Sequence, residues 1–280
     1  MFSRNLKDNW CYFAPFLVSY SLFPKRVVLW YEMQGCYIFF QHGIEKGKQT
    51  IELMFPPCPL DQNGLNVISD LMSDVNYVNI KIIWVNESEK SILKSAFKDR
   101  IKISPKTEEY IYDPNLIYKM RGGSYRDLRK RVNAVRKMAP VFRPMQSNDV
   151  SQSIELVKKW RSNQGRKRNF LLDWGYTINA LQNFSQFSNE DLYSWVIEVQ
   201  EHISAIAMAG PINDDSASFF IAKSDTDIYG LSEYMRWKVY GELRHFSRVN
   251  DAGDLGIRGL RQYKQKFRPL HLERVYTASI

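Results

Sequence analysis

The sequence is poor in the residue types that build common metal, disulfide and hydrolase sites. Its three cysteines, Cys11, Cys36 and Cys58, include no Cys-x-x-Cys pair, which argues against a disulfide framework or a zinc ribbon. Four isolated histidines offer no zinc-ligand spacing. Gly-x-Ser-x-Gly and a P-loop are also missing. We therefore expect no metal site, and scattered unpaired cysteines favour a reducing, cytoplasmic location.

Long apolar runs are scarce. The most apolar early run, from Cys11 to Phe23, is shorter than the roughly 20 residues that cross a bilayer. It also lacks the small-residue cleavage site of a signal peptide. We expect membrane contact, if it occurs, to be peripheral.

Charge and composition indicate a folded protein with an anionic partner. The chain has 280 residues, 44% hydrophobic and 14% aromatic, which suffices for one large domain or two packed ones. Its formal charge of +9 favours nucleic acid or a phospholipid surface. The charge alone does not choose between these two partners.

Strand-like and helical runs alternate along the chain and predict a mixed α/β fold. IKIIWV reads as a buried strand, followed by a capping box in which Asn86 precedes Glu89 by three residues. WVIEVQ, ISAIAMA and SASFFIA read as three successive strands, and a helix is expected from about Leu231 to Phe246.

The segment DAGDLGIRGLRQYKQKFRPLHLERVYTA at residues 251–278 is the most informative part of the sequence. Asp254 occupies the position of an N-cap for a helix from about Leu255 to Lys266, which Pro269 ends. Helical spacing puts Leu260 and Phe267 in a buried stripe with Tyr263. The remaining surface of this helix is strongly cationic.

A second basic helix is predicted shortly before the middle of the chain. Tyr125, Leu128, Val132 and Val135 form its apolar stripe. The opposite surface carries Arg126, Arg129, Lys130, Asn133 and Lys137, and a later loop, RSNQGRKRN, carries Arg166 and Arg168. Such a run is often simply a solvated helix face. The alternative is phosphate contact, because arginine presents a planar fork to phosphate oxygens.

Both basic segments resemble motifs of the phosphatidylglycerol lysyltransferase C-terminal family, which includes the catalytic domain of lysylphosphatidylglycerol synthases and their soluble relatives. The closing motif is matched by Asp254, Leu255, Gly256, Leu260, Arg261, Tyr263, Lys264, Lys266, Phe267, Pro269, Arg274 and Tyr276. The upstream motif is matched by Gly123, Leu128, Arg129 and Asn133. The first hundred residues match in overall pattern alone.

This resemblance implies two tandem N-acetyltransferase-like (GNAT) domains, which we place at residues 1–138 and 139–280. It also implies that the acyl donor is an aminoacyl-tRNA. A CoA-dependent enzyme of this fold would normally hold the pyrophosphate in a glycine-rich loop at a helix N-terminus. The corresponding AKSDTDIYGLSEYM has one glycine, Gly230, and the carboxylates Asp225 and Asp227. CoA is therefore the weaker candidate, although these carboxylates also suit an ordinary polar turn.

Transfer of an aminoacyl ester requires a positioned acceptor, stabilisation of the oxyanion and a route for the proton. Our hypothesis is that Lys264 or Lys266, with Arg261, supplies positive charge to the oxyanion or to the tRNA 3′ end. Asp254 would orient the acceptor or take its proton. The plainer alternatives are an N-cap role for Asp254 and, for Arg261, an ion pair with Glu233 or Glu242.

Three functions therefore stay open. The first is an aminoacyl-tRNA-dependent transferase that acts on a lipid headgroup, a small molecule or a peptide. The second is a CoA-dependent N-acyltransferase on the same fold. The third is a non-catalytic binder of RNA or of an anionic membrane.

Overall fold

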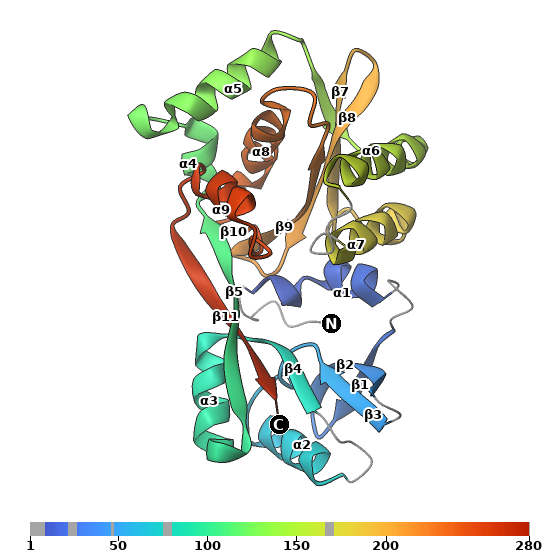
Figure 1. Ribbon diagram of the computed structural model, residues 1–280, viewed down its shortest axis with the longest axis vertical. Coiled ribbons are helices and arrows are strands. Elements are labelled where there is room, and N and C mark those ends of the chain that lie inside the picture. Colours follow the sequence, from blue (N-terminus) through green and yellow to red (C-terminus); the bar gives the residue numbers. More distant parts are fainter. Residues whose placement is uncertain (1–8, 22–26, 46–47, 75–79, 166–170, 280) are drawn as a thin grey trace. The chain divides into compact units, whose positions relative to one another are not determined.

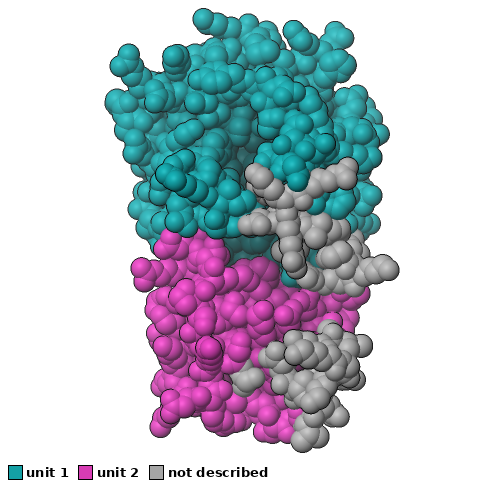
Figure 2. All heavy atoms as spheres, in the orientation of Figure 1, with its two compact units in different colours: residues 1–23, 109–272 teal, residues 24–108, 273–280 magenta. Residues whose placement is uncertain are grey.

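The computed structural model describes residues 9–21, 27–45, 48–74, 80–165 and 171–279. The chain forms two compact units, each assembled from segments distant in sequence (Figure 2). Unit 1 contains residues 1–23 and 109–272, and unit 2 contains residues 24–108 and 273–280. The chain passes between the units within strands β5 (Lys102–Tyr112) and β11 (His271–Ser279).

Unit 1 is built on a mixed sheet with the strand order β5, β10, β9, β8, β7, β6. The further strands are β6 (Val141–Pro144), β7 (Tyr193–Val199), β8 (His202–Pro211), β9 (Ser216–Ser224) and β10 (Arg248–Asn250). The predicted run of three strands is confirmed as the antiparallel meander β7, β8, β9. In contrast, β10 pairs parallel with β9 and antiparallel with β5.

Helices cover both faces of the sheet in unit 1 (Figure 1). They are α1 (Ala14–Ser21), α4 (Pro114–Lys119), α5 (Arg126–Arg136), α6 (Val150–Asn163), α7 (Leu171–Gln182), α8 (Leu231–Glu242) and α9 (Arg258–Gln265). On one face, Leu128 of α5 and Val239 of α8 share a buried core with Phe219 of β9. On the other face, Phe220 packs against the rings of Phe16 in α1 and Tyr176 in α7.

Unit 2 is a smaller α/β unit. Its strands β1 (Val28–Met33), β2 (Cys36–Glu45), β3 (Lys48–Leu53) and β4 (Ile80–Val85) precede β11 in the sheet order, and β3 pairs parallel with β4. Helices α2 (Gln62–Ser73) and α3 (Glu87–Phe97) pack on this sheet through Ile68 and Leu93. The predicted capping box is confirmed, since Asn86 and Glu89 exchange side-chain to backbone hydrogen bonds at the start of α3.

The closing helix begins later than the sequence predicted. It starts at Arg258 with Ile257 as its N-cap, so the prediction of Asp254 as N-cap of a helix from Leu255 is wrong. The physical reason is the backbone of Leu255 and Gly256, whose φ angles are 54° and 70° and therefore not those of a right-handed helix. Asp254 instead accepts a hydrogen bond from the Gly256 amide at 2.9 Å, which closes a local turn.

The helix predicted from about Leu231 to Phe246 ends at Glu242 and continues as a single 3₁₀ turn, Leu243–His245. The expected domain boundary at residues 138 and 139 falls inside unit 1, between α5 and β6. The two compact units are defined by which residues pack together, whereas the predicted boundary divides the sequence into two GNAT-like folds. The compact units therefore do not test that boundary. It therefore stays a prediction.

Gly230 allows α5 to approach the start of α8. It has a φ of 86°, and a Cβ atom there would lie 2.6 Å from the carbonyl oxygen of Arg131. The close packing of α5 against the start of α8 therefore requires a residue without a side chain at position 230.

We predict that Gly230→Ala lowers the free energy of unfolding by about 3 kcal/mol, because left-handed strain adds to overpacking. The control is Gly165→Ala, where φ is also positive at 66° and nothing lies within 4 Å of the added Cβ. This control should cost about 1 kcal/mol. Chemical denaturation of both variants measures the difference, and equal losses would contradict a packing role for Gly230.

Candidate functional site

The pairing of strands β9 and β10 ends at one point in unit 1, and several polar side chains lie there. Their parallel pairing runs from Ser216 to Ser218 of β9, although β9 continues to Ser224. Strand β10 ends at Asn250, where the chain leaves the sheet. We call this place the strand fork. The next residue, Asp251, therefore begins the loop that leads to α9.

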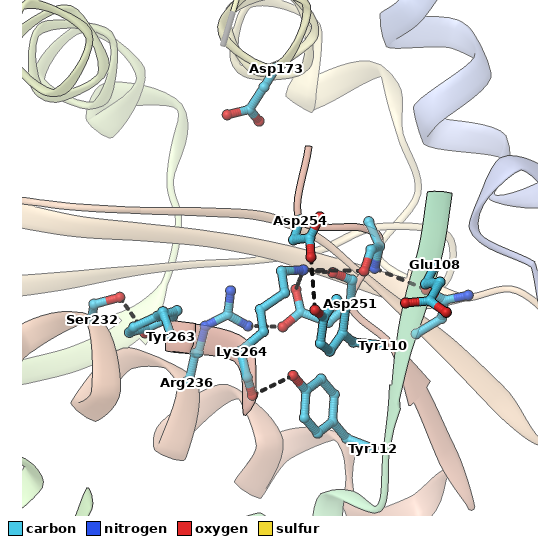
Figure 3. Close-up of polar contacts among 12 residues, drawn as sticks. Glu108, Tyr110, Tyr112, Asp173, Ser232, Arg236, Asp251, Asp254, Tyr263 and Lys264 are labelled. Carbon is cyan, nitrogen blue, oxygen red and sulfur yellow. Dashed lines mark hydrogen bonds and ion pairs between the residues drawn. The ribbon is translucent and has the colours of Figure 1, made fainter. Parts of the chain in front are cut away.

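Asp251 is the centre of a buried group of charges (Figure 3). Its Oδ2 accepts a hydrogen bond from Nη1 of Arg236 on α8, and its Oδ1 lies 3.3 Å from Nζ of Lys264 on α9. All three side chains are buried, with 4 to 5% of each residue exposed. We call Arg236, Asp251 and Lys264 the Asp251 cluster. This cluster links α8 and α9 to the end of β10.

The ammonium group of Lys264 is fully engaged in this cluster. Besides Oδ1 of Asp251, it donates to the backbone carbonyls of Asp251 and Ala252. An ammonium has three N–H groups, and these three acceptors use them. Burial lowers the pKa of Lys264, an effect that the neighbouring Asp251 carboxylate opposes. Its own carbonyl accepts a hydrogen bond from the Tyr112 hydroxyl at 2.9 Å.

Asp254 forms a second buried centre beside the first. Its Oδ2 accepts hydrogen bonds from the Tyr110 hydroxyl of β5 at 2.9 Å and from Nε of Arg261 at 2.7 Å (Figure 3). Burial acts to raise the pKa of Asp254, but Arg261, Tyr110 and the Gly256 amide outweigh it and lower the pKa below its usual value. Burial and Asp254 together raise the pKa of Tyr110 to about 12. Asp254 is therefore a stable carboxylate at neutral pH.

The predicted catalytic residues fall into two groups. Asp254, Arg261 and Lys264 come together at the strand fork, and Arg261 pairs with Asp254, not with the Glu233 or Glu242 named in the alternative. Lys266 is exposed, with its ammonium 5.7 Å from the Tyr263 ring centre. Arg261 also reaches outward, since 54% of its side chain is exposed.

Sequence reasoning missed Tyr110, Arg236 and Asp251. Asp251 lies three residues before Asp254 in the same glycine-containing segment, which is the signal that could have identified it. Tyr110 and Arg236 are 144 and 18 residues away from Asp254, and no local pattern connects them to it.

The predicted nucleic-acid contacts on α5 are mostly exposed. Arg126, Lys130 and Asn133 lie on its solvent face. Arg129 is half-buried and donates to the carbonyls of Met120 and Gly122, so it braces the end of α4. Arg166 and Arg168 lie outside the described residues. Three of the four residues predicted on α5 therefore face solvent, and only Arg129 has a structural role in the contacts of the described residues.

Positive charge is concentrated in unit 1, which contains α5 and α9. By sequence, unit 1 has 27 Lys and Arg residues against 19 Asp and Glu, whereas unit 2 has 12 against 11. Almost the whole excess of the chain therefore belongs to the unit that carries the strand fork.

The start of α8 differs from a diphosphate-binding loop. Asp225 and Asp227 both bind Nζ of Lys159 on α6 at 2.8 Å. Within the first turn of α8, Glu233 is buried and lies 3.5 Å from Nη1 of Arg131. Backbone of α5 covers Gly230, as described above. Carboxylates and packed backbone thus occupy the surroundings of this helix N-terminus.

Comparison with family models matches residues 19–279 to the family "Phosphatidylglycerol lysyltransferase, C-terminal". The chain belongs to this family. The resemblance drawn from the two basic segments is thereby confirmed, and the match also includes residues 19–100, which the motifs did not cover. A comparison with curated proteins found no match.

Solved structures show the same fold. A conserved protein of unknown function from Bacteroides thetaiotaomicron VPI-5482 has a TM-score of 0.85 at 19% identity, covering 98% of this chain and 92% of that one. L-PGS from Bacillus licheniformis has a TM-score of 0.68 at 15% identity, with 94% and 86% covered. A tandem GNAT protein from the clavulanic acid biosynthesis pathway has a TM-score of 0.50 at 9% identity, with 89% and 80% covered. The predicted class, mixed α/β with tandem GNAT-like folds, is confirmed.

The described residues contain neither a membrane-spanning helix nor a metal-ligand group. None of the helices in that part of the chain is long and apolar enough to span a membrane. The same residues contain no group of three or more His, Cys, Asp or Glu side chains arranged to hold a metal ion.

We predict that Asp254→Asn removes a pH-dependent part of the stability. Because folding lowers the pKa of Asp254, its ionised form stabilises the protein above the unfolded value, about 3.8, and this contribution is lost as pH falls through the lower folded value. Wild type should therefore exceed the variant in free energy of unfolding at pH 6, and the gap should close in acid. The control is Asp127→Asn on the exposed surface of α5, and an unchanged gap across pH would contradict the ion pair with Arg261.

Proposed function

We propose that this protein is an aminoacyl-tRNA-dependent transferase. Family membership supports transferase chemistry, and the observation that carries the proposal is the strand fork. There the closing segment brings Asp254, Arg261 and Lys264 together in a cationic unit. The acceptor is then a lipid headgroup, a small molecule or a peptide.

The contacts suggest a division of labour among these residues. Asp254 is held ionised by Tyr110 and Arg261, which suits a carboxylate that orients the nucleophilic group of the acceptor. Arg261 has an exposed side chain and the exposed Lys266 is the C-cap residue of the same helix, so both are available to the 3′ end of the tRNA. Lys264 keeps the turn at Asp251 and Ala252 in place.

The exposed face of α5 supports tRNA as the carrier. Arg126, Lys130 and Asn133 are free to meet phosphate oxygens, and α5 packs directly against α8, which supplies Arg236 to the Asp251 cluster. A cationic helix adjacent to the elements of the site would hold a polyanionic donor close to it.

The surroundings of α8 weigh against acyl-CoA as donor. A diphosphate at this helix N-terminus would meet the buried Glu233 carboxylate and the Arg131 carbonyl, and both oxygens repel it. The non-catalytic binder is the remaining alternative. It gives no reason for three buried charges where a strand pair opens, because such groups cost desolvation energy that simple surface binding does not require.

The direct test is donor turnover by the purified full chain. We expect loss of labelled aminoacyl ester from a pool of charged tRNAs when crude lipid, peptide and metabolite acceptors are supplied. Acetyl-CoA and longer acyl-CoAs should remain intact. Consumption of an acyl-CoA would establish the CoA-dependent alternative, and tRNA binding without turnover would establish the binder.

Salt dependence tests the contact face on α5. With about four phosphate contacts, the logarithm of tRNA affinity should fall against the logarithm of salt with a slope of about 3. Arg126→Ala with Lys130→Ala should reduce that slope by about 1.5. Lys158→Ala on α6, an exposed lysine outside this face, is the control and should leave the slope unchanged. A flat response of wild type to salt would contradict nucleic acid as the partner.

A further inference from the structure

Arg236 has more hydrogen-bond donors than its protein partners use. A guanidinium has five N–H groups. It donates from Nη1 to Asp251 and also interacts with the Tyr263 hydroxyl, whereas the buried Nε has no acceptor among the described residues. Figure 3 shows the other terminal nitrogen turned away from Asp251, on the side of the picture where Asp173 lies. Buried donors normally find partners, so the unused N–H capacity of this guanidinium suits an oxygen that the protein itself does not supply.

Aromatic rings fix the guanidinium in position. Its central carbon lies 4.8 Å from the centre of the Phe219 ring on β9, 5.5 Å from that of Tyr263 and 5.6 Å from that of Phe267. The Tyr263 hydroxyl is itself bound to the Ser232 hydroxyl at 2.5 Å. Rings from a strand and from the closing segment therefore hold the plane of Arg236.

Arg236 also keeps its charge despite burial. Loss of solvent acts to lower its pKa, but the Asp251 carboxylate more than offsets this effect and the pKa is raised. Lys264 differs in both respects, because burial lowers its pKa and its three N–H groups already have acceptors. Of the two buried cations, Arg236 is the one with a donor to offer.

We propose that Arg236 is a catalytic residue that binds the carbonyl oxygen of the transferred acyl group through its second terminal nitrogen. This inference rests on the proposed function and identifies the group that stabilises the oxyanion. Asp251 is then a positioning residue that sets the angle of the guanidinium, and Lys264 positions Asp251 in turn. Arg236 replaces Lys264 and Lys266 as the expected source of the positive charge that stabilises the oxyanion.

The step balances without a cofactor. The acceptor nitrogen or oxygen forms a bond to the ester carbonyl carbon, and the carbonyl electron pair moves onto the oxygen that Arg236 binds. When the pair returns, the bond to the tRNA ribose oxygen breaks. The proton lost by the acceptor ends on that ribose oxygen, so the products are the aminoacylated acceptor and free tRNA. Donors at such an oxygen act most strongly when they are fixed before the reaction.

The test is Arg236→Lys, measured by transfer kinetics with aminoacyl-tRNA. Lysine preserves the charge beside Asp251 but lacks the second terminal nitrogen. We expect kcat to fall by about 10²- to 10³-fold, the loss typical of removing one oxyanion donor, with an unchanged KM for tRNA. Arg143→Lys is the matched control, since Arg143 is also partly buried and ion-paired, with Asp149 and Glu198, on β6. It should transfer at the wild-type rate.

The outcomes separate this inference from the function on which it depends. If wild type transfers and Arg236→Lys matches it in kcat, Arg236 does not bind the reacting oxygen. If wild type fails with every charged tRNA, the proposed function fails first. Should Arg236→Lys not fold, the triple variant Arg236→Gln, Asp251→Asn and Lys264→Gln removes all three buried charges together. This variant should fold and show the same loss of kcat, and wild-type kcat in it would overturn the inference.

Discussion

The ion pair between Arg236 and Asp251 is the interaction on which the site depends. It joins α8 to the end of β10 at the strand fork, and Lys264 brings α9 to the same carboxylate. Three buried charges are costly to desolvate, and removing one partner of such a pair typically costs 3–5 kcal/mol because the other is left unpaired. An apolar set of the same volume would often be equally stable. Stability alone therefore does not explain why this site is charged.

The strand pairing and one left-handed turn determine where these charged side chains lie. Strands β9 and β10 pair over three residues, after which β9 continues to Ser224 and β10 ends. Asp254, a few residues later, uses the left-handed backbone of Leu255 and Gly256 to turn back toward Tyr110 and Arg261. Buried and fixed side chains thus meet where the two strands stop pairing, and the described residues contain no group of His, Cys, Asp or Glu arranged to hold a metal ion.

The sequence predicted the elements of this architecture better than it predicted the site. Alternating apolar residues identified the meander β7, β8, β9, and the Asn86 capping box was placed correctly because both signals are local. Asp254, Arg261 and Lys264 could be predicted as a group because they lie within one short segment of the sequence. Tyr110 and Arg236 could not, since their contacts with that segment exist only after folding. The N-cap prediction for Asp254 failed because the sequence Leu255-Gly256 is compatible both with a tight loop turn and with the first turn of a helix.

The most direct test of this account is to replace the whole Asp251 cluster with apolar residues of similar volume, Arg236→Met, Asp251→Leu and Lys264→Met, and to measure both unfolding and transfer. The account predicts a folded protein with stability near or above that of wild type, intact tRNA binding and no detectable aminoacyl transfer. Transfer at the wild-type rate by this triple variant would contradict the claim that the buried charges at the strand fork serve the reaction.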